Sequence, residues 1–266
     1  MIMMKRILLA FFVLSMALSA TAQRVYINPG HGEWGPEGRN MATITHAEGD
    51  TTGFWESNTN LWKGFALNEK LQAAGLQTLM SRTENGPYPY VWGDESIDKP
   101  LLDLGWEAEY WGATHYISIH SNAHIDGYTT NYPVFIHKGY DGSDTNSGSI
   151  WGEQILWDHH FKIFSALEPY SYYSATNKCI RGGMSMNGWD YGVLRTQDRP
   201  GTLVEGYFHT YQPARHRAMQ PDWCRQEGLR YFRGFTQMYG TAKDTKGYIM
   251  GYVRTKDKQI NQTNYT

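Results

Sequence analysis

The feature that most constrains this fold is a short apolar run, Val25-Tyr26-Ile27, that leads directly into Asn28-Pro29-Gly30-His31-Gly32. β-branched and aromatic residues followed by Pro-Gly predict a strand that stops abruptly, with glycines that allow a sharp turn around the imidazole. A second run, Tyr116-Ile117-Ser118-Ile119, ends in the same way at His120. Taken by itself, the sequence around His31 favours a histidine in a turn over a metal ligand. Because open α/β sheets bind ligands at the carboxyl ends of their strands, the pair predicts a metal site there.

Strand-like and helix-like segments alternate along the rest of the chain, an order typical of a parallel sheet with helices on both faces. We therefore predict a single catalytic domain of the α/β class with a mostly parallel central sheet. A helix is expected to follow Glu56, with Ser57 or Asn58 as its N-cap and its end at Gly75. The other predicted helices span 101–111, 150–167 and 222–239, and the other strands span 76–80, 134–137, 193–194 and 202–205. Loops are predicted at 32–53, 84–100, 141–149 and 169–189.

The two ends of the chain are not expected to belong to this domain. Residues 1–22 combine a basic pair, an apolar run and the small-residue site Ala20-Thr21-Ala22, which predicts a signal peptide. The alternative is an uncleaved membrane anchor. We assign 23–242 to the catalytic domain, which a cleaved signal would make secreted or periplasmic. Residues 243–266 are predicted to be a linker or the first strand of a further β-domain.

Charge and cysteine content exclude some classes of function. A net charge of −2 and a pI near 6.5 give no electrostatic reason to expect a nucleic acid partner or, after signal cleavage, a membrane partner. The two cysteines, Cys179 and Cys224, are too few for a disulfide framework, and they either pair or remain separate buried thiols.

Two carboxylates are candidates for chemistry. Glu56 begins the helix after residue 55, where a negative charge is also favoured by the helix dipole. Glu205 ends the apolar run Leu203-Val204 on a buried strand, where an unpaired carboxylate is rare. It is therefore either catalytic or part of a buried ion pair. Among the remaining histidines, His46 and His209 are candidates for lining the cleft, whereas loop or surface positions are expected for His137, His159, His160 and His216.

The sequence resembles the zinc-dependent N-acetylmuramoyl-L-alanine amidases, cell-wall hydrolases that cut between muramic acid and the stem peptide. The resemblance extends from Val25 to about Gly240 and depends on four blocks in the right order. These blocks are Asn28-Pro29-Gly30-His31-Gly32, Glu56 followed by Asn60-Leu61, Ser118-Ile119-His120-Ser121-Asn122, and Leu203-Val204-Glu205-Gly206-Tyr207-Phe208.

The resemblance implies that His31, Glu56 and His120 bind one Zn²⁺ per chain and that Glu205 is catalytic. The chemistry agrees, because a catalytic zinc keeps three protein ligands and an open fourth position. A carboxylate is also needed to move the proton of water to the leaving amide nitrogen. Asn122 and Arg195 are candidates for substrate binding, although an internal ion pair would explain Arg195 equally well.

The expected reaction is hydrolysis of the amide between N-acetylmuramic acid and L-alanine, with peptidoglycan or muropeptides as the partner and a monomer as the oligomeric state. The alternatives are a zinc peptidase acting within the stem peptide and a catalytically silent peptidoglycan-binding protein. The chain departs from the family in two places. The segment between His120 and Glu205 is long and aromatic, and helix 101–111 lacks the arginine and asparagine that the family usually carries there.

Overall fold

The computed structural model describes residues 23–32, 40–41, 54–86, 99–124 and 129–241. The predicted signal peptide, the predicted tail segment and His46 lie outside the described residues, so those predictions stay untested. Among the helices that are described, none is both long enough and apolar enough to cross a membrane.

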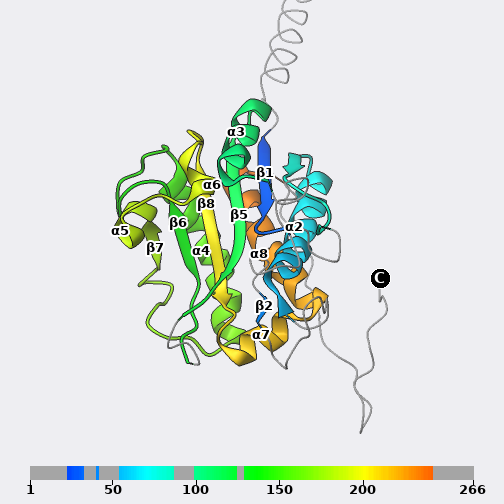
Figure 1. The fold of residues 1–266 in the computed structure, drawn as a ribbon, viewed down its shortest axis with the longest axis vertical. Coiled ribbons are helices and arrows are strands. Elements are labelled where there is room, and N and C mark those ends of the chain that lie inside the picture. The colour runs from blue at the N-terminus through cyan, green and yellow to red at the C-terminus, as the bar shows by residue number, and fades with distance from the viewer. Residues whose placement is uncertain (1–22, 33–39, 42–53, 87–98, 125–128, 242–266) are drawn as a thin grey trace, which may run out of the picture.

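A six-stranded sheet forms the centre of the molecule (Figure 1). Neighbouring strands are parallel except for the pair β8 and β6, which is antiparallel. The predicted α/β class with a mostly parallel sheet is therefore confirmed. In spatial order the strands are β4 (Gln77–Met80), β1 (Arg24–Pro29), β5 (His115–Asn122), β8 (Gly201–Phe208), β6 (Val134–His137) and β7 (Ile180–Gly182).

Helices cover both faces of this sheet (Figure 1). They are α2 (Glu56–Ala73), α3 (Leu101–Trp111), α4 (Ser149–Leu167), α5 (Gly183–Asn187), α6 (Gly192–Arg195), α7 (Gln212–Ala218) and α8 (Pro221–Tyr239). The hydroxyl of Tyr26 donates a 2.6 Å hydrogen bond to Glu107 of α3. On the opposite face, the Thr202 hydroxyl donates a 2.7 Å bond to Glu153 of α4. Since side chains alternate along a strand, residues 116, 118 and 120 of β5 share the face that α3 covers.

The core lies mainly between the sheet and the layer of α2, α8 and α4, which pack against one another in that order. Val25, Ile27, Ile117 and Ile119 are fully buried there, together with Leu67 and Leu71 of α2. The β-branched residues of β1 and β5 favour extended backbone and fit the pleated surface, which is why both form strands inside the sheet rather than at its edges. The helix α8 ends at Gly240, whose φ of 64° is the left-handed conformation that favours glycine.

The structure corrects the predicted beginning of α2. The helix begins at Glu56 with Trp55 as its N-cap, so neither Ser57 nor Asn58 caps it. Trp55 belongs to β3 (Phe54–Trp55), which pairs with β2 (Asn40–Met41). This antiparallel pair determines where the helix begins, and it also means that the predicted loop 32–53 contains a short strand.

Several other local predictions of secondary structure and burial were also wrong. Residues 193–194 form α6 rather than a strand, because two apolar residues show no period that separates a helical turn from an extended segment. The predicted loop 169–189 contains β7 and α5, and α7 was not predicted. The two cysteines are separate, buried thiols. His137 and His160 are fully buried rather than on loops or the surface.

Candidate metal centre

Three of the predicted site residues meet at the carboxyl edge of the sheet. His31 follows β1, Glu56 is the first residue of α2, and His120 lies near the end of β5. One ligand atom from each lies within 4.8 Å of the others, so the three could hold a metal ion. The Nε2 atom of His31 is 3.4 Å from Oε2 of Glu56, and Nδ1 of His120 is 3.4 Å from its Oε1.

The turn that carries His31 depends on its neighbouring glycine. His31 has a φ of 59°, a left-handed conformation that is uncommon for a residue with a side chain. A Cβ added at Gly30 would lie 2.0 Å from Cε1 of His120, so only glycine lets the imidazole of His120 lie against the turn. This close approach is the physical reason for glycine immediately before His31.

Arg82 joins this turn to the beginning of α2. Its buried guanidinium donates to the carbonyl oxygens of Pro29, Gly30 and Ser57, at 2.9, 3.1 and 2.7 Å. A planar guanidinium with five N–H donors in fixed directions is suited to holding several carbonyls at once. Arg82 therefore connects the segment before His31 to the segment after Glu56.

The carboxylate of Glu56 is buried, and it is also held from the side of β5. The backbone N–H of Ser121 donates a 2.8 Å hydrogen bond to its Oε1. Burial by itself would raise the pKa of Glu56, but the charge of His31 and hydrogen bonds from His120 and His31 outweigh it. The pKa therefore lies well below its usual value. Glu56 thus presents a charged carboxylate to both histidines.

His120 is oriented by a hydrogen-bonded chain on the α3 face of the sheet. Its Nε2 lies 3.1 Å from the hydroxyl of Ser118, which also accepts a 2.9 Å bond from the side chain of Asn28. Burial lowers the pKa of His120, which favours the neutral imidazole. Without a metal, Nδ1 donates toward Glu56; a proton moved to Nε2, toward Ser118, would free Nδ1 to act as a metal ligand.

Glu205 lies beside this cluster because of strand register. It pairs with His120 across the parallel strands β5 and β8, so both side chains share the α3 face. Glu205 is largely buried. Burial and then the charge of Glu205 raise the pKa of Tyr191, which begins the segment leading into α6. The pairing therefore places a carboxylate beside the histidine cluster.

His209 lies against the cluster more closely than its sequence position suggested. It is buried, and its Nδ1 is 3.8 Å from Oε2 of Glu56 and 3.0 Å from the hydroxyl of Ser121. Burial lowers its pKa, so the imidazole favours the neutral form. The sequence predicted only that His209 would be a candidate for the cleft lining.

Lys63 is a buried residue behind the site that sequence reasoning missed. Its Nζ donates a 3.2 Å hydrogen bond to the backbone carbonyl of His120 and lies 3.0 Å from Oε1 of Glu227. Lys63 lies seven residues after Glu56 on the same face of α2, but this spacing alone does not distinguish it from a solvated helix residue. Pairing between β5 and β8 shifts in register immediately after His120, and such irregularities re-aim side chains near active sites.

The remaining predicted residues lie outside the three-residue cluster. The Oδ1 atom of Asn122 accepts a 2.8 Å bond from the N–H of Ala123. Arg195 is exposed, and its guanidinium donates to the carbonyl of Asp190 at 3.1 Å. Substrate-binding roles for Asn122 and Arg195 stay predictions.

A mostly parallel sheet with two histidines and a glutamate at its carboxyl edge defines an α/β protein with a candidate metal site. The family model described as N-acetylmuramoyl-L-alanine amidase matches residues 25–236, so the chain belongs to this family. Membership supports peptidoglycan amidase activity, implies peptidoglycan as the substrate and suggests action in the extracellular space or the periplasm. Comparison with curated proteins gives no match.

Solved amidase structures share the fold. AmiC2 of Nostoc punctiforme is 19% identical, with a TM-score of 0.58, and the match covers 82% of this chain and 97% of that one. An amidase from Clostridium difficile 630 is 21% identical, with a TM-score of 0.60 and coverages of 86% and 100%. Ami1 from Mycobacterium smegmatis is 18% identical, with a TM-score of 0.59 and coverages of 82% and 97%.

Proposed function

We propose that this chain hydrolyses the amide between the lactyl group of N-acetylmuramic acid and L-alanine, with one Zn²⁺ held by His31, Glu56 and His120. The observation that carries the proposal is the approach of three ligand atoms to within 4.8 Å in a chain of the amidase family. Two imidazole nitrogens and one carboxylate oxygen suit zinc, whereas magnesium and calcium prefer oxygen ligands.

When bound, zinc would polarise the substrate carbonyl and lower the pKa of a bound water to about 7. The chain supplies the remaining chemistry through Glu205, which accepts the proton of the attacking water and delivers it to the leaving amide nitrogen. Its position beside His120 on the same face of the sheet supports this role. Ser118 and Arg82 keep His120 and the His31 turn in place during the reaction.

Two other functions were considered from the sequence. A zinc peptidase acting within the stem peptide would use the same donors, and only its products distinguish it. A catalytically silent peptidoglycan-binding protein has no need for a buried carboxylate beside the cluster, so Glu205 favours an enzyme. We further propose that the chain is exported and cleaved after Ala22, which N-terminal analysis of exported protein tests by finding Gln23.

The experiment is digestion of purified peptidoglycan by the mature protein, with and without a chelator, followed by mass spectrometry of the fragments. The amidase reaction releases peptides with an L-alanine amino terminus and leaves the glycan strands intact. We expect the chelator to stop release and added Zn²⁺ to restore it. Fragments cut inside the stem peptide would contradict the amidase assignment, and full activity in the chelator would contradict the metal.

A further inference from the structure

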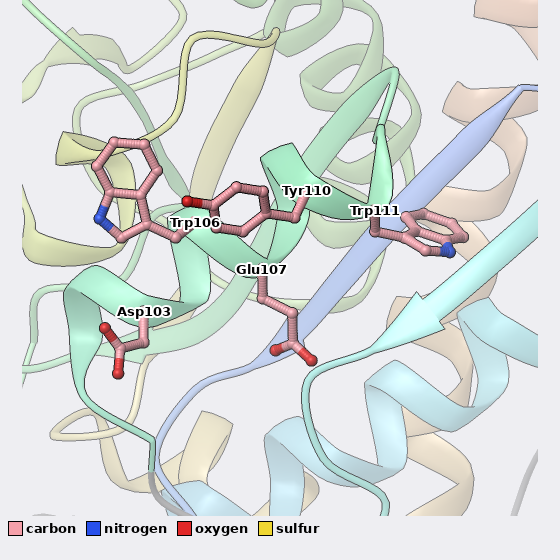
Figure 2. A pocket seen from close by; sticks show the side chains of 5 residues that line it. All are labelled: Asp103, Trp106, Glu107, Tyr110 and Trp111. Carbon is pink, nitrogen blue, oxygen red and sulfur yellow. The ribbon is translucent and has the colours of Figure 1, made fainter.

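An open hollow on the outer side of α3 is lined by Asp103, Trp106, Glu107, Tyr110 and Trp111 (Figure 2). It lies toward the amino edge of the sheet, because Arg24, the first residue of β1, donates to the carbonyl of Trp111. Nothing in the described part of the chain shows what would occupy this hollow. The buried polar residues on the opposite face of the sheet, by contrast, contact the backbone of the candidate site directly.

The backbone of the site is irregular where β5 and β8 carry their functional residues. His120 pairs with Glu205, but Asn122 pairs with Phe208, so β8 has one extra residue over this interval. A shift of this kind leaves backbone groups without the partners that a regular ladder would supply. Two carbonyl oxygens at the shift, those of His120 and Gly206, accept hydrogen bonds from side chains.

The donors of these two hydrogen bonds are fully buried and come from two different helices. Nζ of Lys63, on α2, donates to the carbonyl of His120 at 3.2 Å. Nε2 of His160, on α4, donates to the carbonyl of Gly206 at 2.9 Å. A carbonyl oxygen only accepts, so Nε2 carries the proton of this imidazole. One donor therefore holds a proposed metal ligand, and the other holds the residue that follows Glu205.

Glu227 of α8 connects the two donors. Its Oε1 lies 3.0 Å from Nζ of Lys63 and accepts a 2.7 Å hydrogen bond from the hydroxyl of Tyr231. The ring of Tyr231 stacks on that of His160, with centroids 5.4 Å apart and 12° between the planes. A Cβ added at Gly206 would overlap the carboxylate of Glu227, so glycine is what lets the carboxylate lie against β8 at this point.

We propose that Lys63 and His160 are positioning residues for the two halves of the proposed amidase site. Lys63 fixes the end of β5 that carries the ligand His120, and His160 fixes the part of β8 that carries the base Glu205. The inference rests on the proposed amidase function. A buried ion pair such as Lys63–Glu227 is weak evidence for stability, because apolar residues of similar volume often pack as well. Hydrogen bonds to two defined carbonyls do what apolar packing cannot, which is to fix the separation of ligand and base.

The Lys63 half predicts a loss of metal affinity that is separate from stability. We expect the zinc dissociation constant of K63M, measured by competition with a chromogenic chelator, to rise about tenfold, the effect of losing roughly one hydrogen bond. K63M/E227Q removes the unpaired carboxylate charge, yet it should bind zinc as weakly as K63M. Wild-type zinc affinity in either variant would overturn this half of the proposal.

The His160 half predicts slower turnover with unchanged zinc affinity. H160F keeps an aromatic ring in the stack but removes the donor to Gly206. Its kcat on a soluble muropeptide at saturating zinc should fall about tenfold, with KM unchanged. H160Q, whose amide nitrogen can take the place of Nε2, should regain most of kcat. The control H115F replaces a buried histidine near the other end of β5 and should keep both zinc affinity and kcat.

Wild-type kcat in H160F, or an equal loss of kcat in H160F and H115F, would overturn the His160 half. The zinc measurement needs no substrate, so it separates this proposal from the proposed function. If the wild type released no peptide from peptidoglycan, the amidase function and the His160 half would both fail, and the chelator competition would still decide the Lys63 half.

Discussion

The strand β5 carries a histidine near each end, and the two differ in the groups that surround them. His115 begins the strand and faces α4 and α8, where its ring meets Phe235 edge to face at 5.1 Å. His120 lies near the other end and on the opposite face, beside Glu56 and Ser118. His115 is buried and His120 is partly exposed, and only His120 lies beside a carboxylate and a hydroxyl that could orient a metal ligand.

The comparison shows that burial alone does not make a histidine functional. Burial alone lowers the pKa of His115 to about 4, so it is a neutral core residue. Burial also lowers the pKa of His120, but the nearby carboxylate of Glu56 opposes that shift. The candidate metal site lies at the carboxyl edge of the sheet because β1, α2 and β5 all end or begin there.

The largest expected effect is the loss of metal on removing a ligand at the functional end of β5. In H120A we expect zinc to fall from about one ion per chain to near zero, with activity reduced to background. Metal analysis of the purified protein and the peptidoglycan assay measure the two quantities. H115A is the matched control, and it should keep its zinc although it creates a cavity. Zinc at the wild-type level in H120A would remove His120 from the ligand set.

The next effect concerns the buried charge behind the site. K63M leaves Glu227 buried without its 3.0 Å partner and should lower the free energy of unfolding by about 3–5 kcal/mol. Urea denaturation measures this loss. The control K99M removes a partly exposed partner of Glu107 and should cost at most about 1 kcal/mol.

A second variant separates charge burial from packing. In K63M/E227Q the carboxylate charge left behind by K63M is gone, so part of the stability should return, although buried Arg230 loses Glu227 as one of its partners. If the double variant were no more stable than K63M, the ion pair would not be the source of the loss. Lys63 also donates a hydrogen bond to the carbonyl of His120, and both variants lack it. We therefore expect K63M and K63M/E227Q to bind zinc more weakly than the wild type.

The smallest expected effect is the pH dependence that comes from the non-functional end of β5. The pKa of His115 is about 4 in the folded chain and near 6.5 when unfolded, so its contribution to stability is complete above pH 6.5. That contribution is lost as the pH falls from 6.5 toward 4, because only the unfolded chain takes up the proton.

Between pH 7 and pH 5 this linkage amounts to about 1–2 kcal/mol. We expect H115Q to lose less stability than the wild type over this interval, as measured by urea denaturation at both pH values. Equal losses in the two proteins would mean that His115 takes up its proton without unfolding. His115 would then be less strictly a neutral core residue than the structure indicates, and it would differ less from His120.

The sequence predicted the centre of the site because that signal is local. His31 and His120 each follow a buried β-branched run, and residues 101–111 and 134–137 form the predicted helix and strand. That Glu56 lies beside the two histidines could be expected only from the family resemblance. Its contact with Ser121 joins residues far apart in the chain.

What could not be predicted depends on tertiary contacts. Val193 and Leu194 look like a short strand, but they are helical because α3 packs against α6. Lys63 looks like a solvated helix residue until Glu227 of α8 is known to face it. The exposed rings of α3 look like core residues by type, and only the structure shows that nothing in the described part of the chain covers them.

The proposed mechanism requires that His31, Glu56 and His120 hold zinc while Glu205 moves protons without holding it. The most direct test is E205Q, which keeps the size of the side chain but removes the base. We predict that zinc stays near one ion per chain while turnover on peptidoglycan falls by roughly 10²–10⁴-fold. Loss of zinc from E205Q would make Glu205 a ligand, and wild-type turnover would contradict the proposed mechanism.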